Sequence, residues 1–437
     1  MKTQSETEAS SPRPFGLGHG PILVALALAA AITYLPFAAL PPLQDDYGHV
    51  WLAEKYGGPS GWGALLGDPL SRCRATSLMW TAATLQLFGY SNLAFHLSGI
   101  LLHAINAWLL YALGSCRWVG WRVSAAAALV FAVRERPHEA VIWYASIHEL
   151  LVFAFVLLAV LAWVRWLEGG SRWWWAAVGA AWVLALASKE SGILLAGLLP
   201  VFALCYPGRR KAAGLVLALG IVSTAAYFLW AFSQRAQHLH FHDGTFLFGA
   251  HFLRTALNSA ARGLWVWGGL SLATLWVCRA RVERRVVVLA LAWFSGALLP
   301  YLFLTYMPRI PSRHHYLASG GAALLIGAAG WAAVDGVRRP RLAASCLVAV
   351  FLLHNWTYLW TYKHAQFVQR AELLEGLLRA VQRQPGGPVV VRCREVLLPE
   401  ARLAVHYRLH WDGAALVRPD EAGAPGRPYF CPGATGP

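Results

Sequence analysis

Two adjacent aspartates, Asp45 and Asp46, directly follow the first apolar segment of the chain that is long enough to cross a membrane. Ionised carboxylates are costly beside hydrocarbon, so a pair held at a membrane face is a candidate functional site. Such carboxylates could act as a general base or bind a divalent cation through their oxygens. The simpler alternative is a helix N-cap or a solvated turn, where aspartate is also common.

Other acidic residues border apolar segments in the same way. Glu139 follows His138 ahead of one such segment, Glu149 begins the next, and Glu190 follows Lys189 between two more. Glu139 could orient an acceptor or a base. Capping and helix-dipole compensation explain acidic residues at these places equally well. We therefore keep His138, Glu149 and Glu190 as further pocket candidates.

Three cations stand where they could contact a phosphate at the interface. Lys189 lies between two apolar runs, Arg313 precedes a late one, and Arg74 lies in the first long loop. Ammonium and guanidinium groups are common phosphate ligands. The alternatives are a structural Lys189–Glu190 ion pair and simple anchoring of Arg313, His315 and Tyr316 at the membrane surface.

Histidine and cysteine do not define a metal site. His238, His240 and His242 alternate, but without an acidic or cysteine partner they are better explained as loop histidines. His96, His103 and Asn106 share one helix face and predict hydrogen bonds between helices. The seven cysteines contain no C-x-x-C pair, although Cys393 and Cys431 could form a disulfide. We assign no cofactor and leave a divalent metal at the aspartate pair open.

The composition places these residues in a membrane protein. Of 437 residues, 57% are hydrophobic and 13% are charged, about half the charged share of a soluble protein. We predict an all-α polytopic fold with about eleven spans of roughly 20 apolar residues. The predicted spans are residues 21–41, 93–114, 120–134, 149–167, 173–188, 190–206, 212–232, 256–278, 286–306, 316–334 and 342–361.

Basic residues predict the orientation of these spans. They concentrate in every second loop, which by the positive-inside rule puts residues 1–20 in the cytoplasm. The net charge of +16 is thus explained by basic loops that set the orientation of the spans, and we expect no nucleic-acid partner. The aspartate pair, the long loops 42–92 and 233–255 and the C-terminal segment 362–437 then share the outer face. Helical and β-like runs make that segment a small extracytoplasmic α/β appendage.

These motifs, taken in order, resemble those of the GT-C membrane glycosyltransferases. They are most similar to bacterial relatives of the protein O-mannosyltransferases and of the eukaryotic transmembrane, tetratricopeptide-linked O-mannosyltransferases. The resemblance covers about residues 21–361. The matching stretches are Asp45-Asp46, Arg74 to Gly89, Phe95-His96, Leu101 to Asn106, Glu139 to Trp143, Glu149 to Leu151, Lys189-Glu190 and Arg313 to Ser319. Arg134-Glu135 replaces a usual His-Pro, Arg-His-His-Tyr replaces Arg-Tyr-Leu-Tyr, and Ala318 replaces a proline. No tetratricopeptide pattern follows.

The resemblance implies a transferase in a bacterial inner membrane that uses a polyprenyl-phosphate sugar donor. Asp45 or Asp46 would act as the base on an acceptor hydroxyl of a protein, lipid or glycan, with inversion at the sugar. Arg313, helped by Lys189 or Arg74, would stabilise the departing phosphate, and Glu139 would orient the acceptor or the base.

Two other classes of function remain open. A transporter or flippase of a lipid-linked or anionic substrate would need charges near mid-membrane and two related halves, and neither is visible in the sequence. The absence of a Walker loop argues against a transporter with its own ATP site. A non-catalytic membrane scaffold with the same fold is the third possibility.

Overall fold

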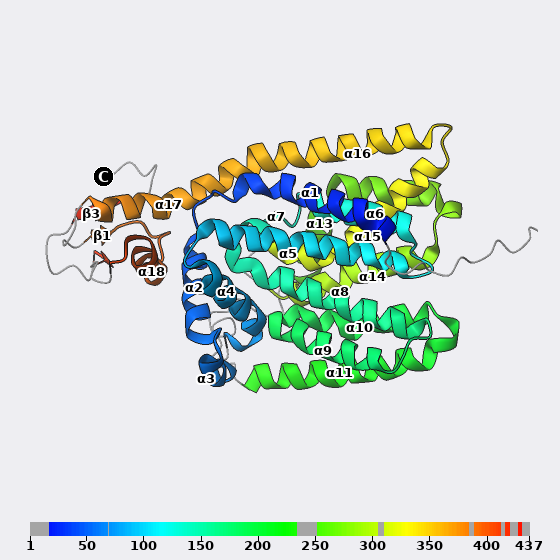
Figure 1. The fold of residues 1–437 in the computed structure, drawn as a ribbon, viewed down its shortest axis with the longest axis horizontal. Coiled ribbons are helices and arrows are strands. Elements are labelled where there is room, and N and C mark those ends of the chain that lie inside the picture. Colours follow the sequence, from blue (N-terminus) through cyan, green and yellow to red (C-terminus); the bar gives the residue numbers. More distant parts are fainter. Residues whose placement is uncertain are drawn as a thin grey trace, which may run out of the picture.

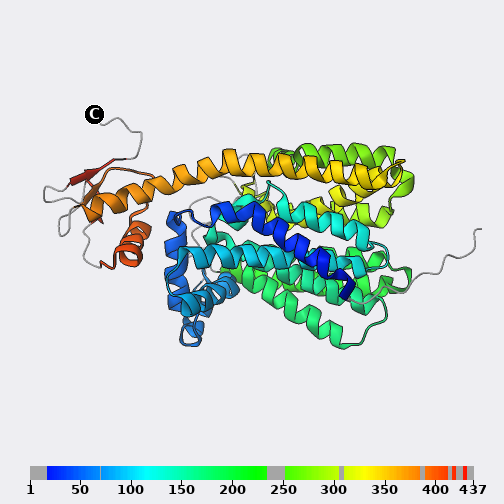
Figure 2. The ribbon, with the colours of Figure 1, turned by 45° about the horizontal axis from the view of Figure 1, so that its top comes forward.

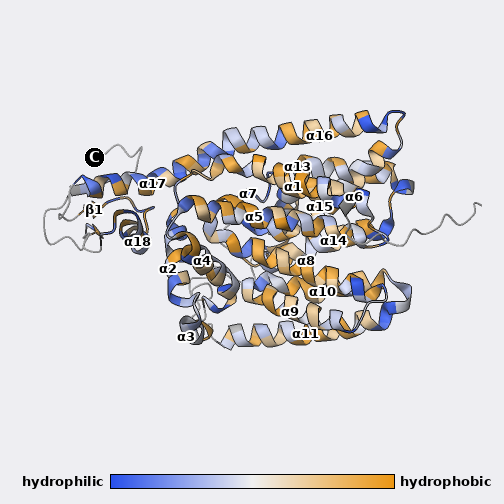
Figure 3. Ribbon diagram, in the orientation of Figure 1, coloured by the Kyte–Doolittle hydropathy of each residue, from blue (hydrophilic) through white to orange (hydrophobic). Residues whose placement is uncertain are grey.

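The computed structural model describes residues 17–68, 70–233, 251–304, 310–383, 389–411, 416–419 and 427–430. Long, roughly antiparallel helices form a bundle, and a small appendage projects from one end of it (Figures 1 and 2). Apolar residues cover much of the bundle helices (Figure 3). The predicted histidine loop with His238, His240 and His242 lies outside the described residues.

Each predicted span contains a helix. These helices are α1 (Gly20–Tyr34), α5 (Asn92–Ala112), α6 (Trp121–Val133), α8 (Ile147–Leu167), α9 (Trp173–Ser188), α10 (Leu195–Leu204), α11 (Arg210–Ser233), α13 (Phe252–Val277), α14 (Arg284–Leu298), α15 (Tyr316–Asp335) and α16 (Pro340–Thr357). Among the described residues, seven helical stretches are long and apolar enough to cross a membrane. Helices α6, α9 and α10 are shorter apolar helices, and α13 is not among the seven. A total of eleven crossings therefore stays a prediction.

Helix α15 forms the centre of the bundle because its small residues let neighbouring backbones approach closely. A Cβ atom on Gly321 would lie 2.5 Å from the Ala290 carbonyl oxygen of α14. One on Gly327 would lie 2.6 Å from the Ala127 nitrogen of α6. Replacing these glycines would force the helices apart, so the glycines set the spacing of the core.

The first long loop is itself helical. It contains α2 (Gln44–Tyr56), α3 (Trp62–Gly67) and α4 (Ala75–Phe88). These helices lie at the end of the bundle from which the appendage projects, whereas the turn from α15 to α16 lies at the opposite end (Figure 1). The short α7 (His138–Ile142) follows α6.

The C-terminal segment has the predicted helix–strand character. A π-helix, η12 (Tyr358–Lys363), joins α16 to α17 (His364–Gln382) as one continuous helical stretch. The strands β1 (Val389–Val391), β2 (Leu416–Val417) and β3 (Arg427–Tyr429) form a parallel sheet in the order β2-β1-β3, and α18 is Leu398–Leu409. Cys393 is disulfide-bonded, while its predicted partner Cys431 lies outside the described residues.

Candidate functional site

Asp46 anchors the start of α2. One carboxylate oxygen accepts a hydrogen bond from the Leu43 backbone N–H at 2.7 Å, and the other accepts one from the Ala145 N–H at 2.7 Å. The first bond is half of a capping box, in which the third helical residue caps the helix start. Burial raises the pKa of Asp46 to about 7, opposed by these two backbone bonds. Both oxygens are therefore occupied in holding α2 against the segment after α7.

Asp45 has a different environment. Its side chain is exposed, and its carboxylate makes no hydrogen bond or ion pair with the described part of the chain. Desolvation by the surrounding protein raises its pKa, and the positive charges of Arg313 and Arg370 oppose that rise. Asp45 is thus an accessible carboxylate beside two cations.

Glu139 connects the same two cations to α7. One of its oxygens accepts a hydrogen bond from the Arg313 backbone N–H at 3.2 Å, and the other lies 3.8 Å from Nη1 of Arg370. The guanidinium groups of Arg313 and Arg370 lie 4.7 and 4.9 Å from the centre of the Trp143 ring. The structure therefore brings together Asp45, Asp46, Glu139 and Arg313, and adds Arg370 of α17, which the sequence analysis missed.

A second, buried group lies at the ends of α8, α9 and α15. The Lys189 ammonium donates to one oxygen of Glu149. His314 Nδ1 lies 2.6 Å from that oxygen and 2.9 Å from the Lys189 nitrogen. The ring of Tyr301 stacks on His314 with centroids 4.4 Å apart. Lys189 is therefore paired across helices with Glu149 and not with its neighbour Glu190.

Glu190 pairs with Arg74 at 2.9 Å, which joins the 3-10 turn before α4 to the start of the next helical segment. Both Arg74 and Lys189 are thus committed to carboxylates. Of the three predicted phosphate ligands, only Arg313 has a charged group that makes no ion pair or hydrogen bond to the described residues.

The remaining pocket candidates lie inside the packed helices. His138 is buried, and its Nδ1 lies 2.7 Å from the Glu135 carbonyl oxygen. His315 contacts the carbonyl oxygens of Pro311 at 3.1 Å and Ser259 at 3.0 Å. Tyr316 is fully buried and bonds to His103 at 2.8 Å and to Asn106 at 3.0 Å. These three act in packing, and the predicted interhelical bonds of His103 and Asn106 are confirmed.

Neither group contains a cluster of metal ligands within the described residues. No cluster of three or more His, Cys, Asp or Glu suited to a metal occurs among the residues that the structure describes. Since both oxygens of Asp46 already accept backbone hydrogen bonds, the aspartate pair presents only the Asp45 carboxylate. One carboxylate is too few protein ligands for a calcium site, whereas Mg²⁺ is commonly held by one or two carboxylates with water and phosphate oxygens.

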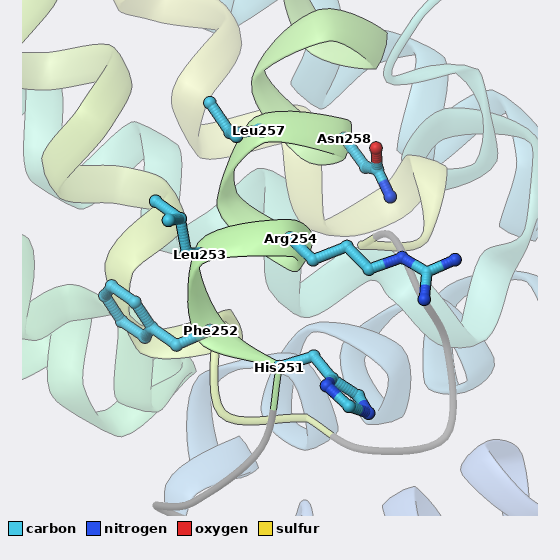
Figure 4. Close-up of a pocket in the computed structure, with 6 residues that line it drawn as sticks. All are labelled: His251, Phe252, Leu253, Arg254, Leu257 and Asn258. Carbon is cyan, nitrogen blue, oxygen red and sulfur yellow. The ribbon is translucent and has the colours of Figure 1, made fainter.

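An open pocket lies elsewhere, at the beginning of α13 (Figure 4). It is open and has a volume of about 650 Å³. In Figure 4, Arg254 and Asn258 extend from one side of the helix and Leu253 from the other. Its lining consists of His251, Phe252, Leu253, Arg254, Leu257 and Asn258, and includes no predicted site residue.

Comparison with known proteins finds only distant similarity. No family model matches the sequence, and no curated protein matches it. Two crystal structures of ArnT from Cupriavidus metallidurans, one bound to undecaprenyl phosphate and one in the apo state, are 17% identical to this chain. Each match covers 88% of this chain and 74% of the ArnT chain, with a TM-score of 0.49.

The Archaeoglobus fulgidus oligosaccharyltransferase, tethered with an acceptor peptide containing the NVT sequon, is 12% identical. That match covers 94% of this chain and 65% of the other, again with a TM-score of 0.49. Similarity at this level assigns no activity, substrate or residue role, so the function has to be argued from the site itself.

Proposed function

We propose that this protein is an integral membrane glycosyltransferase of the GT-C type. It moves a sugar from a polyprenyl-phosphate donor to an acceptor hydroxyl at the outer face of a bacterial inner membrane. The observation that carries the proposal is the accessible carboxylate of Asp45 beside Arg313 and Arg370, at one end of a bundle of apolar helices. A donor anchored in the bilayer would present its phosphate at that end.

Asp45 is the better candidate for the base, since both oxygens of Asp46 are occupied by backbone N–H groups. In the proposed reaction the acceptor oxygen bonds to the anomeric carbon while the bond from that carbon to the phosphate oxygen breaks. Asp45 takes the hydroxyl proton, and the lipid phosphate leaves with the bonding electrons. Displacement from the opposite face inverts the anomeric configuration. The base must come within about 3 Å of the hydroxyl oxygen.

Arg313 is the principal candidate for stabilising the departing phosphate, because its guanidinium has no ion pair or hydrogen bond to the described residues and could bond in bidentate fashion. Lys189 and Arg74 are paired with Glu149 and Glu190 and support the surrounding helix ends. Glu139 accepts the Arg313 backbone N–H and so fixes the segment that carries this arginine. Its proposed role is orientation and not proton transfer.

The experiment is transfer by purified protein in liposomes that contain polyprenyl-phosphate sugars, with mass spectrometry of the products. We expect Asp45→Asn to reduce the rate by a factor on the order of 10² to 10⁴, as for the loss of a general base. Glu283→Gln, in the exposed Arg285–Glu283 pair, is the matched control and should leave the rate unchanged.

An unchanged rate in an inserted Asp45→Asn protein would reject the role of the base. If the donor crosses the bilayer intact and no sugar is transferred, the protein is a flippase. Glycan mass spectrometry of a deletion strain would identify the sugar and show whether the acceptor is a protein, a lipid or a glycan.

A further inference from the structure

Helix α17 places a row of side chains on α7, the helix that carries Glu139. Lys363, at the end of the π-helix, Phe367 and Arg370 are spaced by four and three residues and so share one helix face. The Phe367 ring lies 6.1 Å from the His138 ring, centre to centre. Arg370 lies 5.1 Å from the Phe367 ring and 4.9 Å from that of Trp143. The C-terminal segment thus forms part of the wall around the candidate site.

The two guanidinium groups on this wall make few fixed contacts, although the Asp45 carboxylate lies nearby. The Arg313 guanidinium has no ion pair or hydrogen bond within the described chain, and it lies over the ring of Trp143. Arg370 lies 3.8 Å from Glu139, which is the outer limit of an ion pair, and its side chain is 35% exposed. The indole Nε1 of Trp143 is buried and has no acceptor among the described residues. N–H donors of the two guanidinium groups therefore remain available to the oxygens of a ligand beside the Asp45 carboxylate.

The appendage fixes the position of α17 relative to the aspartates. Gln44, which directly precedes Asp45, donates to the Glu395 carbonyl oxygen at 2.8 Å and accepts from the Leu397 N–H at 2.6 Å. The Tyr407 ring of α18 stacks on that of Tyr90 with centroids 5.1 Å apart. Arg408 of α18 pairs with Glu375 of α17 at 2.9 Å. Helices α2, α17 and α18 are therefore tied together.

We propose that Arg370, supplied by α17, completes with Arg313 a subsite that binds the phosphate of a lipid-linked ligand. This inference rests on the proposed function and adds to it a ligand-binding residue from the C-terminal segment. Two guanidinium groups offer several N–H donors in planar arrays, which match the oxygens of a phosphate. α17 continues the membrane-length α16, which in the proposed arrangement carries Arg370 out of the hydrocarbon toward the headgroups.

The test is direct binding of undecaprenyl phosphate to the full-length protein in detergent, measured by native mass spectrometry without turnover. Arg370→Gln should weaken binding about 10- to 100-fold, as expected when a hydrogen bond to a charged group is lost. Arg370→Lys, which keeps the charge, should recover part of the affinity. Arg379→Gln is the matched control, since Arg379 is on the same helix but pairs with the exposed Glu372.

Two further arms identify the ligand group. Unphosphorylated undecaprenol should bind the native and Arg370→Gln proteins equally, because it lacks the phosphate. Inorganic phosphate should compete only at far higher concentration than the lipid phosphate, since it lacks the chain. If inorganic phosphate competes at the same concentration as the lipid phosphate, the proposal of a lipid ligand is overturned and the site binds free phosphate.

The inference is overturned if Arg370→Gln binds undecaprenyl phosphate as tightly as Arg379→Gln does, or if the native protein does not bind it. Thermal unfolding of each variant separates a lost contact from a lost fold. Failure of the proposed function is a different result, in which the native protein binds the lipid phosphate through Arg370 yet transfers no sugar.

Discussion

Asp45 and Asp46 are neighbours in the sequence but have opposite environments. Successive residues of a helix point about 100° apart, so when Asp46 faces the segment after α7, Asp45 faces outward. The pair was predictable from its place after the first apolar run. The different environments of the two carboxylates were not predictable, because the position of Asp46 depends on the Ala145 N–H, about a hundred residues away in the chain.

Asp46 predicts a pH dependence of stability. Its pKa is raised in the folded protein from 3.8 to about 7, so the folded state binds a proton more tightly than the unfolded chain does. Its stabilising contribution is then complete below about pH 4 and is lost as the pH rises through about 7. In detergent, the Tm of the native protein should fall more steeply from pH 5 to pH 8 than that of Asp46→Asn. Equal slopes would contradict this assignment.

The partner of Lys189 illustrates a limit of sequence reasoning. The adjacent Glu190 was the obvious candidate, but neighbouring residues do not face each other on a helix or turn. Lys189 instead reaches Glu149 across the bundle, forty residues away. Arg370 was missed for a similar reason, since nothing local distinguishes it from the other arginines of the C-terminal segment.

The buried ion pair predicts a large effect on stability. Lys189→Met leaves the Glu149 carboxylate uncompensated in the protein interior, which should cost about 3–5 kcal/mol. Arg379→Met breaks a pair whose side chains are 50% and 44% exposed and should cost under about 1 kcal/mol. Thermal unfolding in detergent compares the two variants. Similar losses of stability would contradict a buried, charged Glu149.

At the scale of elements, periodic apolar runs predicted where the helices lie but not how they pack. Each predicted span contains a helix, and the α/β character of the C-terminal segment is also found. The docking of α18 on α2 could not be predicted, because Gln44 and Glu395 are 351 residues apart and their contact depends on the whole bundle.

The close approach of α14 and α15 predicts that Gly321 cannot be replaced. In Gly321→Ala the new methyl group would collide with the Ala290 carbonyl oxygen, which should cost about 1–3 kcal/mol as overpacking. Gly269→Ala is the control: it has open space around it, and alanine favours the helix there by up to about 1 kcal/mol. Unfolding midpoints of the two variants in detergent should shift in opposite directions.

At the scale of the whole molecule, the candidate site and the appendage share one end of the bundle (Figure 1). The connection from α15 to α16, with Arg338, Arg339 and Arg341, lies at the other end. The basic residues of this connection predict that its end of the bundle faces the cytoplasm.

Reporter insertions would determine this orientation. A reporter that is active only outside the cytoplasm should work when it is fused after Pro437 and fail when it is inserted after Gly336. A reporter that is active only inside should give the reverse pattern. The same response at both positions would contradict the proposed topology.

The helical stretch from Pro340 to Gln382 contains 43 residues, so at 1.5 Å per residue it is about 65 Å long, roughly twice the hydrocarbon thickness of a bilayer. Such a helix has a fixed length, and one end of it is anchored in lipid. A thinner or thicker membrane would raise or lower Arg370, which lies about 45 Å along this helix, relative to the headgroups. The rate of the proposed sugar transfer should therefore vary with the acyl-chain length of the surrounding lipids, even when the donor and the acceptor stay the same.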